Sequence, residues 1–65
     1  MRELMMICAR ANVVCREKRH GKVWLAAPGA KRGFLVTVQD APSLVAHGPR
    51  MYTVAMAQGL TPQKG

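Results

Sequence analysis

The sequence predicts a small, mainly β domain, a curled sheet or partly open barrel of five to six short strands. Three observations support this fold class. Segments rich in β-branched and aromatic residues recur along the chain. In the segments 34–39 and 51–57, the residues at even positions (Phe34, Val36, Val38; Tyr52, Val54, Met56) alternate with a different set at odd positions (Leu35, Thr37, Gln39; Met51, Thr53, Ala55). Such alternation is typical of a strand with two different faces. Turn-forming residues separate the segments, most clearly in the sequence PGAKRG at 28–33.

The first twenty residues allow two interpretations. As strands, 4–9 and 13–18 flank a turn at 10–12, and a second turn at 20–21 leads into the next strand. The poor helix formers at 12–15 favour this interpretation. The alternative is an α+β fold, in which an N-terminal helix over 2–20 packs on a three-stranded sheet. Such a helix places one apolar stripe on a single face, formed by Leu4, Ile7, Cys8, Ala11, Val14 and Cys15.

Three further strands follow in the preferred interpretation. The segment 22–27 contains Val23, Trp24 and Leu25, and 34–39 follows the turn at 28–33. The sequences DAPS at 40–43 and HGP at 47–49 mark two more breaks, after which 51–57 forms the last strand.

The chain has 65 residues, which predicts one folded unit. We assign residues 1–58 to a single small basic domain and the polar segment 59–65 to a flexible C-terminal tail. A chain of this size buries only about 60% of the surface that its unfolded form exposes. Its stability should therefore be modest, and a homo-oligomer or a complex with a partner is a reasonable expectation.

Positive charge is the strongest functional signal. Ten lysines and arginines against three acids give a net charge of +7, which attracts nucleic acid, anionic membrane or acidic protein surfaces. Six of the ten fall between 16 and 32, where Glu17 is the only acid. We predict that these six contact nucleic acid or an acidic surface: Arg16, Lys18, Arg19, Lys22, Lys31 and Arg32.

The strand interpretation divides this set into two patches. The first four residues crowd the tip of a hairpin, whereas Lys31 and Arg32 follow the far end of the strand 22–27. Six residues at ~3.3 Å each separate the patches by ~20 Å unless the sheet curls. The three aromatic residues, Trp24, Phe34 and Tyr52, are assigned to the core, so base stacking is not expected.

The sequence predicts no metal, cofactor or catalytic site. Cys8, Cys15 and His20 have the spacing C-x6-C-x4-H, which matches no compact metal site. The only serine, Ser43, lies in a predicted turn, and the acids are scattered. The cysteines also report on the fold, because they face each other across a hairpin but lie too far apart on one helix.

We therefore expect a small, basic, non-catalytic module that contacts nucleic acid or a ribonucleoprotein through a basic hairpin and loop. The alternative is a regulatory protein-interaction module, such as a small viral or mobile-element inhibitor or adaptor that docks on an acidic protein surface. The short apolar run at 4–9, interrupted by Arg10, predicts neither an export signal nor a membrane span. A cytoplasmic location with reduced thiols is expected.

Overall fold

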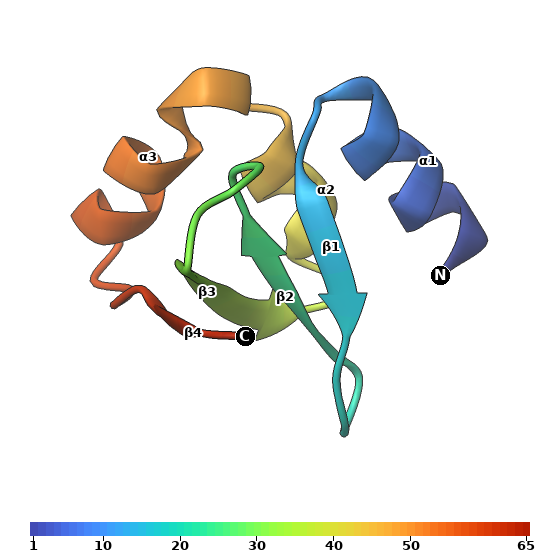
Figure 1. The fold of residues 1–65 in the computed structure, drawn as a ribbon. Coiled ribbons are helices and arrows are strands. Elements are labelled where there is room, and N and C mark those ends of the chain that lie inside the picture. Colours follow the sequence, from blue (N-terminus) through green and yellow to red (C-terminus); the bar gives the residue numbers. More distant parts are fainter.

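The computed structural model describes all 65 residues and shows an α+β fold, in which three helices cover one face of a four-stranded antiparallel sheet (Figure 1). The strands lie in the order β1-β2-β3-β4. None of the helices is long and apolar enough to cross a membrane. The elements in chain order are α1 (Arg2–Arg10), β1 (Val14–Glu17), β2 (Lys22–Ala26), β3 (Arg32–Thr37), α2 (Ala41–Val45), the 3-10 turn η1 (Gly48–Arg50), α3 (Met51–Ala57) and β4 (Gln63–Lys64).

The mainly β prediction is therefore correct only in the middle of the chain. The predicted strands 13–18, 22–27 and 34–39 correspond to β1, β2 and β3, with shifted ends. The predicted strands 4–9 and 51–57 are wrong, because these segments form α1 and α3. The alternative of a helix packed on a sheet fits better, although the helix ends at Arg10 and the sheet has a fourth strand.

Helix α1 is short because Asn12 ends it. Asn12 adopts a left-handed backbone with φ 58°, a conformation that asparagine tolerates better than most residues. Its N–H donates to the Ala9 carbonyl at 3.2 Å, and the Val13 N–H donates to the Cys8 carbonyl at 2.8 Å. These two hydrogen bonds cap the helix, because they satisfy carbonyl groups that have no partner within it. The chain then turns directly into β1.

Helix α3 ends in the same way. Gly59 has φ 88°, and its N–H donates to the Met56 carbonyl at 3.0 Å. The Leu60 N–H donates to the Ala55 carbonyl at 3.0 Å, and Leu60 packs against the core. Met51 and Ala55, four residues apart, face the protein interior. The segment therefore presents one buried helical face, although its alternating pattern predicted a strand.

The core lies between the helices and one face of the sheet. Val23 and Leu25 of β2 and Phe34 of β3 are fully buried there. The helices contribute the other members of the cluster: Leu4, Cys8, Ala41, Leu44, Val45, Met51 and Ala55. Because strand side chains alternate between faces, Trp24 lies on the opposite face of the sheet. It is nevertheless only 4% exposed.

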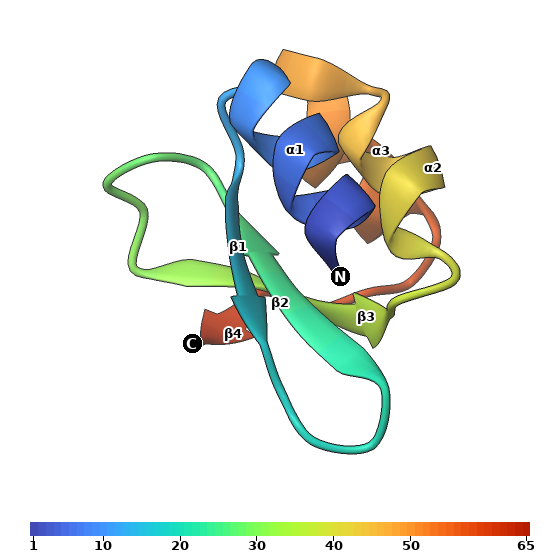
Figure 2. The same cartoon turned by 90° about the vertical axis from the view of Figure 1, so that its right-hand side faces the viewer.

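The segment 59–65, predicted as a tail, crosses this opposite face. Gln63 and Lys64 pair with Gly33 and Arg32 of β3. The Trp24 indole N–H donates to the Gln63 carbonyl at 2.9 Å, and the backbone of Gly65 lies against the indole ring. The sheet therefore curls at this end, as Figure 2 shows. The mobility that the sequence predicts for this segment stays a prediction.

Tyr52 of α3 fastens the loop between β2 and β3. Its hydroxyl accepts a hydrogen bond from the Ala27 N–H at 3.0 Å and donates one to the Arg32 carbonyl at 2.6 Å. Its ring also packs edge-on against Phe34, with the centroids 5.0 Å apart. The two ends of the loop are thus held by one side chain.

Replacing Tyr52 with phenylalanine should lower the free energy of unfolding by about 1–3 kcal/mol, because it leaves two backbone groups without their partner. Urea denaturation measures this loss, and hydrogen exchange should show faster exchange at Ala27. Thr53→Ala, at the exposed neighbouring position, is the control. A midpoint equal to that of the wild type would contradict the proposed fastening.

Candidate nucleic-acid interface

The hairpin between β1 and β2 projects beyond the rest of the molecule (Figures 1 and 2). Its strands pair from Val14 with Ala26 to Glu17 with Val23. The Lys18 N–H then donates to the Lys22 carbonyl at 2.9 Å. Two consecutive left-handed residues, His20 (φ 62°) and Gly21 (φ 68°), reverse the chain. The tip therefore consists of exposed basic residues on a short, defined turn.

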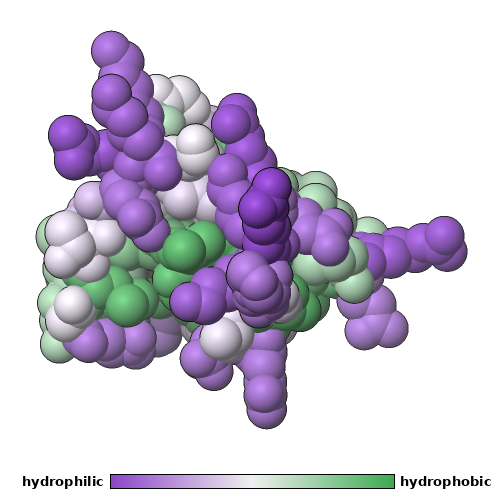
Figure 3. All heavy atoms as spheres, turned by 90° about the horizontal axis from the view of Figure 1, so that it is seen from below, coloured by the Kyte–Doolittle hydropathy of each residue, from purple (hydrophilic) through white to green (hydrophobic).

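A hollow of about 520 Å³ lies beside this tip. Its lining has four lysines or arginines, one histidine and no acid. We call it the basic hollow, and its residues are Lys18, Arg19, His20, Lys22, Trp24, Leu35, Gln63 and Lys64. Figure 3, seen from below, shows long hydrophilic side chains projecting from this side of the molecule. No carboxylate among the lining residues offsets these positive charges.

Trp24 forms a buried wall of the hollow. The guanidinium carbon of Arg16 lies 5.4 Å from the centroid of the indole ring, close enough for a cation–π contact. The ring is otherwise covered by the C-terminal segment. Arg16 is therefore positioned at the edge of the basic hollow, while the indole is unavailable as a platform for stacking bases.

Lys64 is the residue that the sequence interpretation missed. It lies opposite Arg32 in the β3–β4 register and also lines the basic hollow with Lys18 and Arg19. It therefore connects the two patches that the sequence predicts as separate. We call the whole set the basic track, and all of its members are exposed: Arg16, Lys18, Arg19, Lys22, Lys64, Arg32 and Lys31. A lone lysine in a polar C-terminal segment gave no signal of this role.

The two cysteines form a separate cluster on the helix-covered face of the sheet. Cys8 of α1 is 1% exposed, Cys15 of β1 is half-buried, and both are free thiols. They meet because α1 turns back into β1 at Asn12. The cysteines therefore lie neither on two paired strands nor on one long helix, the two arrangements that the sequence suggested. Burial, together with a hydrogen bond to Cys15 and the charge of Cys15, raises the pKa of the Cys8 thiol from 9.0 to about 12.

This raised pKa predicts that the protein loses stability in alkali. Between pH 9 and 12 the unfolded chain releases the Cys8 proton, whereas the folded chain retains it. The stability that the protonated Cys8 thiol contributes is therefore complete below pH 9 and is lost as pH rises toward 12. Urea midpoints measured across this range should fall more steeply for the wild type than for Cys8→Ala. Equal slopes would contradict the prediction.

No three histidine, cysteine or acidic side chains come close enough together to hold a metal ion. His20 lies at the hairpin tip, whereas His47 follows α2. Comparison with known proteins gives no match, whether with family models, curated proteins or solved structures. The site must therefore be interpreted from its own chemistry.

Proposed function

We propose that this protein is a non-catalytic module that binds nucleic acid by contacting phosphates along the basic track. The observation that carries the proposal is the basic hollow, where Lys18, Lys22 and Lys64 converge from the hairpin turn, β2 and β4 without an acid among the lining residues. Cations held together in this way repel one another. Binding of phosphates relieves this repulsion and releases counterions from the nucleic acid.

Contact with the backbone, rather than with bases, is the proposed mode. Trp24 is 4% exposed, and Phe34 is fully buried. Stacking recognition needs exposed rings. Flexible lysine and arginine side chains instead follow a phosphate backbone and fix its position. Affinity should therefore depend strongly on salt and weakly on base sequence.

The basic track also suggests how a nucleic-acid strand lies on the protein. Lys64 stands between the hairpin tip and Arg32, so a phosphate backbone can pass from the tip across β4 to the β2–β3 loop. The hairpin provides the projecting end of this path. We further propose that the protein acts in the cytoplasm, where such partners are found.

The proposal is tested by the salt dependence of binding. Anisotropy of a labelled oligonucleotide of mixed sequence, as RNA and as DNA, should give log affinities that fall linearly with the logarithm of salt concentration. A slope near zero would reject the proposed phosphate contacts.

Lys64→Glu should weaken binding about tenfold or more at low salt and reduce the salt slope by about one, the effect expected from one lost phosphate contact. The matched control is Arg10→Glu, an exposed position at the end of α1. It makes the same change in net charge away from the track. Equal losses in the two variants would mean that overall charge, and not the track, governs binding.

A further inference from the structure

Strand β4 leaves most of β3 without a neighbour on one side. The β3–β4 register contains only Arg32 with Lys64 and Gly33 with Gln63, so the segment 34–37 has β2 on one side and no strand on the other. At ~3.3 Å per residue this open edge is ~13 Å long. An uncovered edge is a template for pairing with another extended chain.

The direction of the backbone groups along this edge follows from the register. Residues of an antiparallel strand direct their N–H and C=O groups alternately to its two sides. The Val38 N–H donates to the Gly21 carbonyl, on the β2 side, at 2.9 Å. Leu35 and Thr37, an odd number of residues away, therefore direct theirs to the open edge. The Thr37 carbonyl accepts from the Asp40 N–H at 3.1 Å, which leaves both groups of Leu35 and the Thr37 N–H for a partner.

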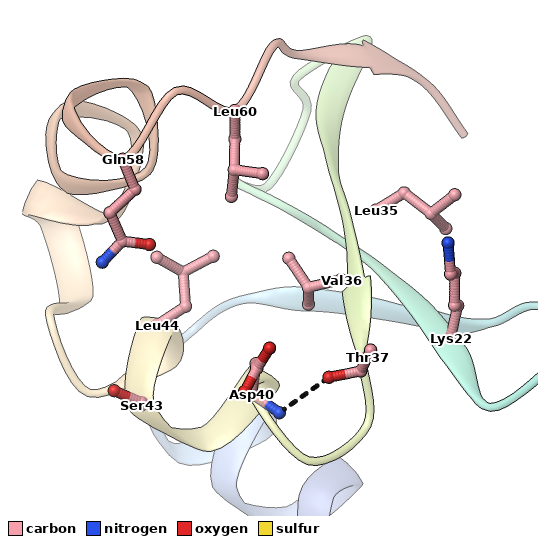
Figure 4. A pocket seen from close by; sticks show the side chains of 9 residues that line it. All are labelled: Lys22, Leu35, Val36, Thr37, Asp40, Ser43, Leu44, Gln58 and Leu60. Carbon is pink, nitrogen blue, oxygen red and sulfur yellow. Dashed lines mark hydrogen bonds between the residues drawn. The ribbon is translucent and has the colours of Figure 1, made fainter.

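A pocket of about 470 Å³ lies beside the same edge (Figure 4). Leu35 and Val36 point to opposite faces of β3, yet both line the pocket, which therefore lies at the edge of the strand. Val36, Leu44 and Leu60 point toward one another across an apolar floor (Figure 4). The rest of the lining carries polar groups: Lys22, Thr37, Asp40, Ser43 and Gln58.

We propose that this edge binds an extended segment of a partner protein, which joins the sheet as an additional strand beside 34–37. Pairing with Leu35 and Thr37 supplies backbone hydrogen bonds, and alternate apolar side chains of the segment enter the pocket. The other side chains lie on the face of Lys22, which stands with Leu35 on the other side of β3 from Val36 and Leu60 (Figure 4). Acidic residues there complement Lys22 and the net charge of +7.

A second copy of this chain is a poorer occupant of the edge. Two chains of charge +7 repel each other. The partner is therefore a different protein with an acidic and apolar alternating segment. This inference concerns backbone pairing at β3 and does not depend on the proposed nucleic-acid function.

The probe for this site is a blocked hexapeptide of alternating valine and glutamate, titrated to about 2 mM, the weak end of the affinity range. Binding should shift the NMR amide signal of Leu35 most strongly. The same peptide with serine in place of valine keeps its charge but lacks the apolar side chains, and it should bind at least tenfold more weakly. Equal binding of the two peptides, no binding, or shifts confined to Lys18, Arg19 and Lys64 would overturn the proposal.

Two variants at one position test the backbone pairing. Thr37→Pro removes the N–H at the open edge, a place where strands tolerate proline, and should lower affinity for the valine peptide at least tenfold. Thr37→Val keeps this N–H and loses only the hydroxyl that accepts from the Asp40 N–H at 3.1 Å, so it should bind as the wild type does. Thermal melting confirms that both fold.

Nucleic-acid affinity should be unchanged in both variants, which separates a failure of the proposed strand pairing from a failure of the proposed nucleic-acid function. Equal peptide affinities for the two variants would overturn the strand pairing.

Discussion

Reversing Lys18, Arg19 and Lys22 to glutamate should abolish nucleic-acid binding. These residues provide three of the four lysine and arginine side chains of the basic hollow, and each reversal replaces an attraction for phosphate with a repulsion. Loss of three phosphate contacts, together with this repulsion, should lower affinity by more than about 100-fold at low salt. Fluorescence anisotropy with a labelled oligonucleotide measures the effect, and Trp24, the only tryptophan and a wall of the hollow, gives an independent fluorescence signal.

The control for this triple variant has the same net charge. Arg2→Glu, Arg10→Glu and Arg50→Glu together alter three exposed arginines of α1 and η1, none of them in the basic track. This variant should retain most of the affinity and lose only the contribution of long-range attraction. If both triple variants bind equally weakly, net charge alone accounts for binding. If the hairpin variant binds as tightly as the wild type, the basic hollow is not the site.

The sequence predicted the sheet better than the helices. The segment 22–27 is apolar on both faces, and β2 is indeed covered on both, by the helical core on one side and by β4 and Arg16 around Trp24 on the other. The strand predictions for 4–9 and 51–57 were wrong because six or seven residues are too few to distinguish a two-residue period from a 3.6-residue period. The deciding signals were local. Asn12 and Gly59, each followed by an apolar residue, end the two helices.

The candidate site was only partly predictable, for a different reason. A cluster such as Lys18, Arg19 and Lys22 is visible in the sequence because its members are neighbours along the chain. Lys64 joins them only through the pairing of β4 with β3 and through the hydrogen bond from Trp24 to Gln63. Contacts across such a separation depend on tertiary packing, for which the local pattern of a short polar segment gives no signal.

Phe34→Ala should largely unfold the protein at physiological temperature. Phe34 is fully buried at the centre of the core and packs edge-on against Tyr52. Truncation of a buried phenylalanine costs about 3–5 kcal/mol, whereas a chain of this length has a total stability of only about 3–10 kcal/mol. The midpoint of thermal unfolding should therefore fall by roughly 15–30 °C, as circular dichroism would measure.

The loss should extend to the basic track, because Tyr52 positions both Phe34 and the Arg32 carbonyl. Phe34→Leu keeps most of the buried volume, and its cost of about 1–1.5 kcal/mol should leave a folded protein that still binds nucleic acid. A Phe34→Ala variant that melts cooperatively within a few degrees of the wild type would show that the stability of the domain does not depend on this ring. The helices would then be held to the sheet mainly by the smaller side chains around it.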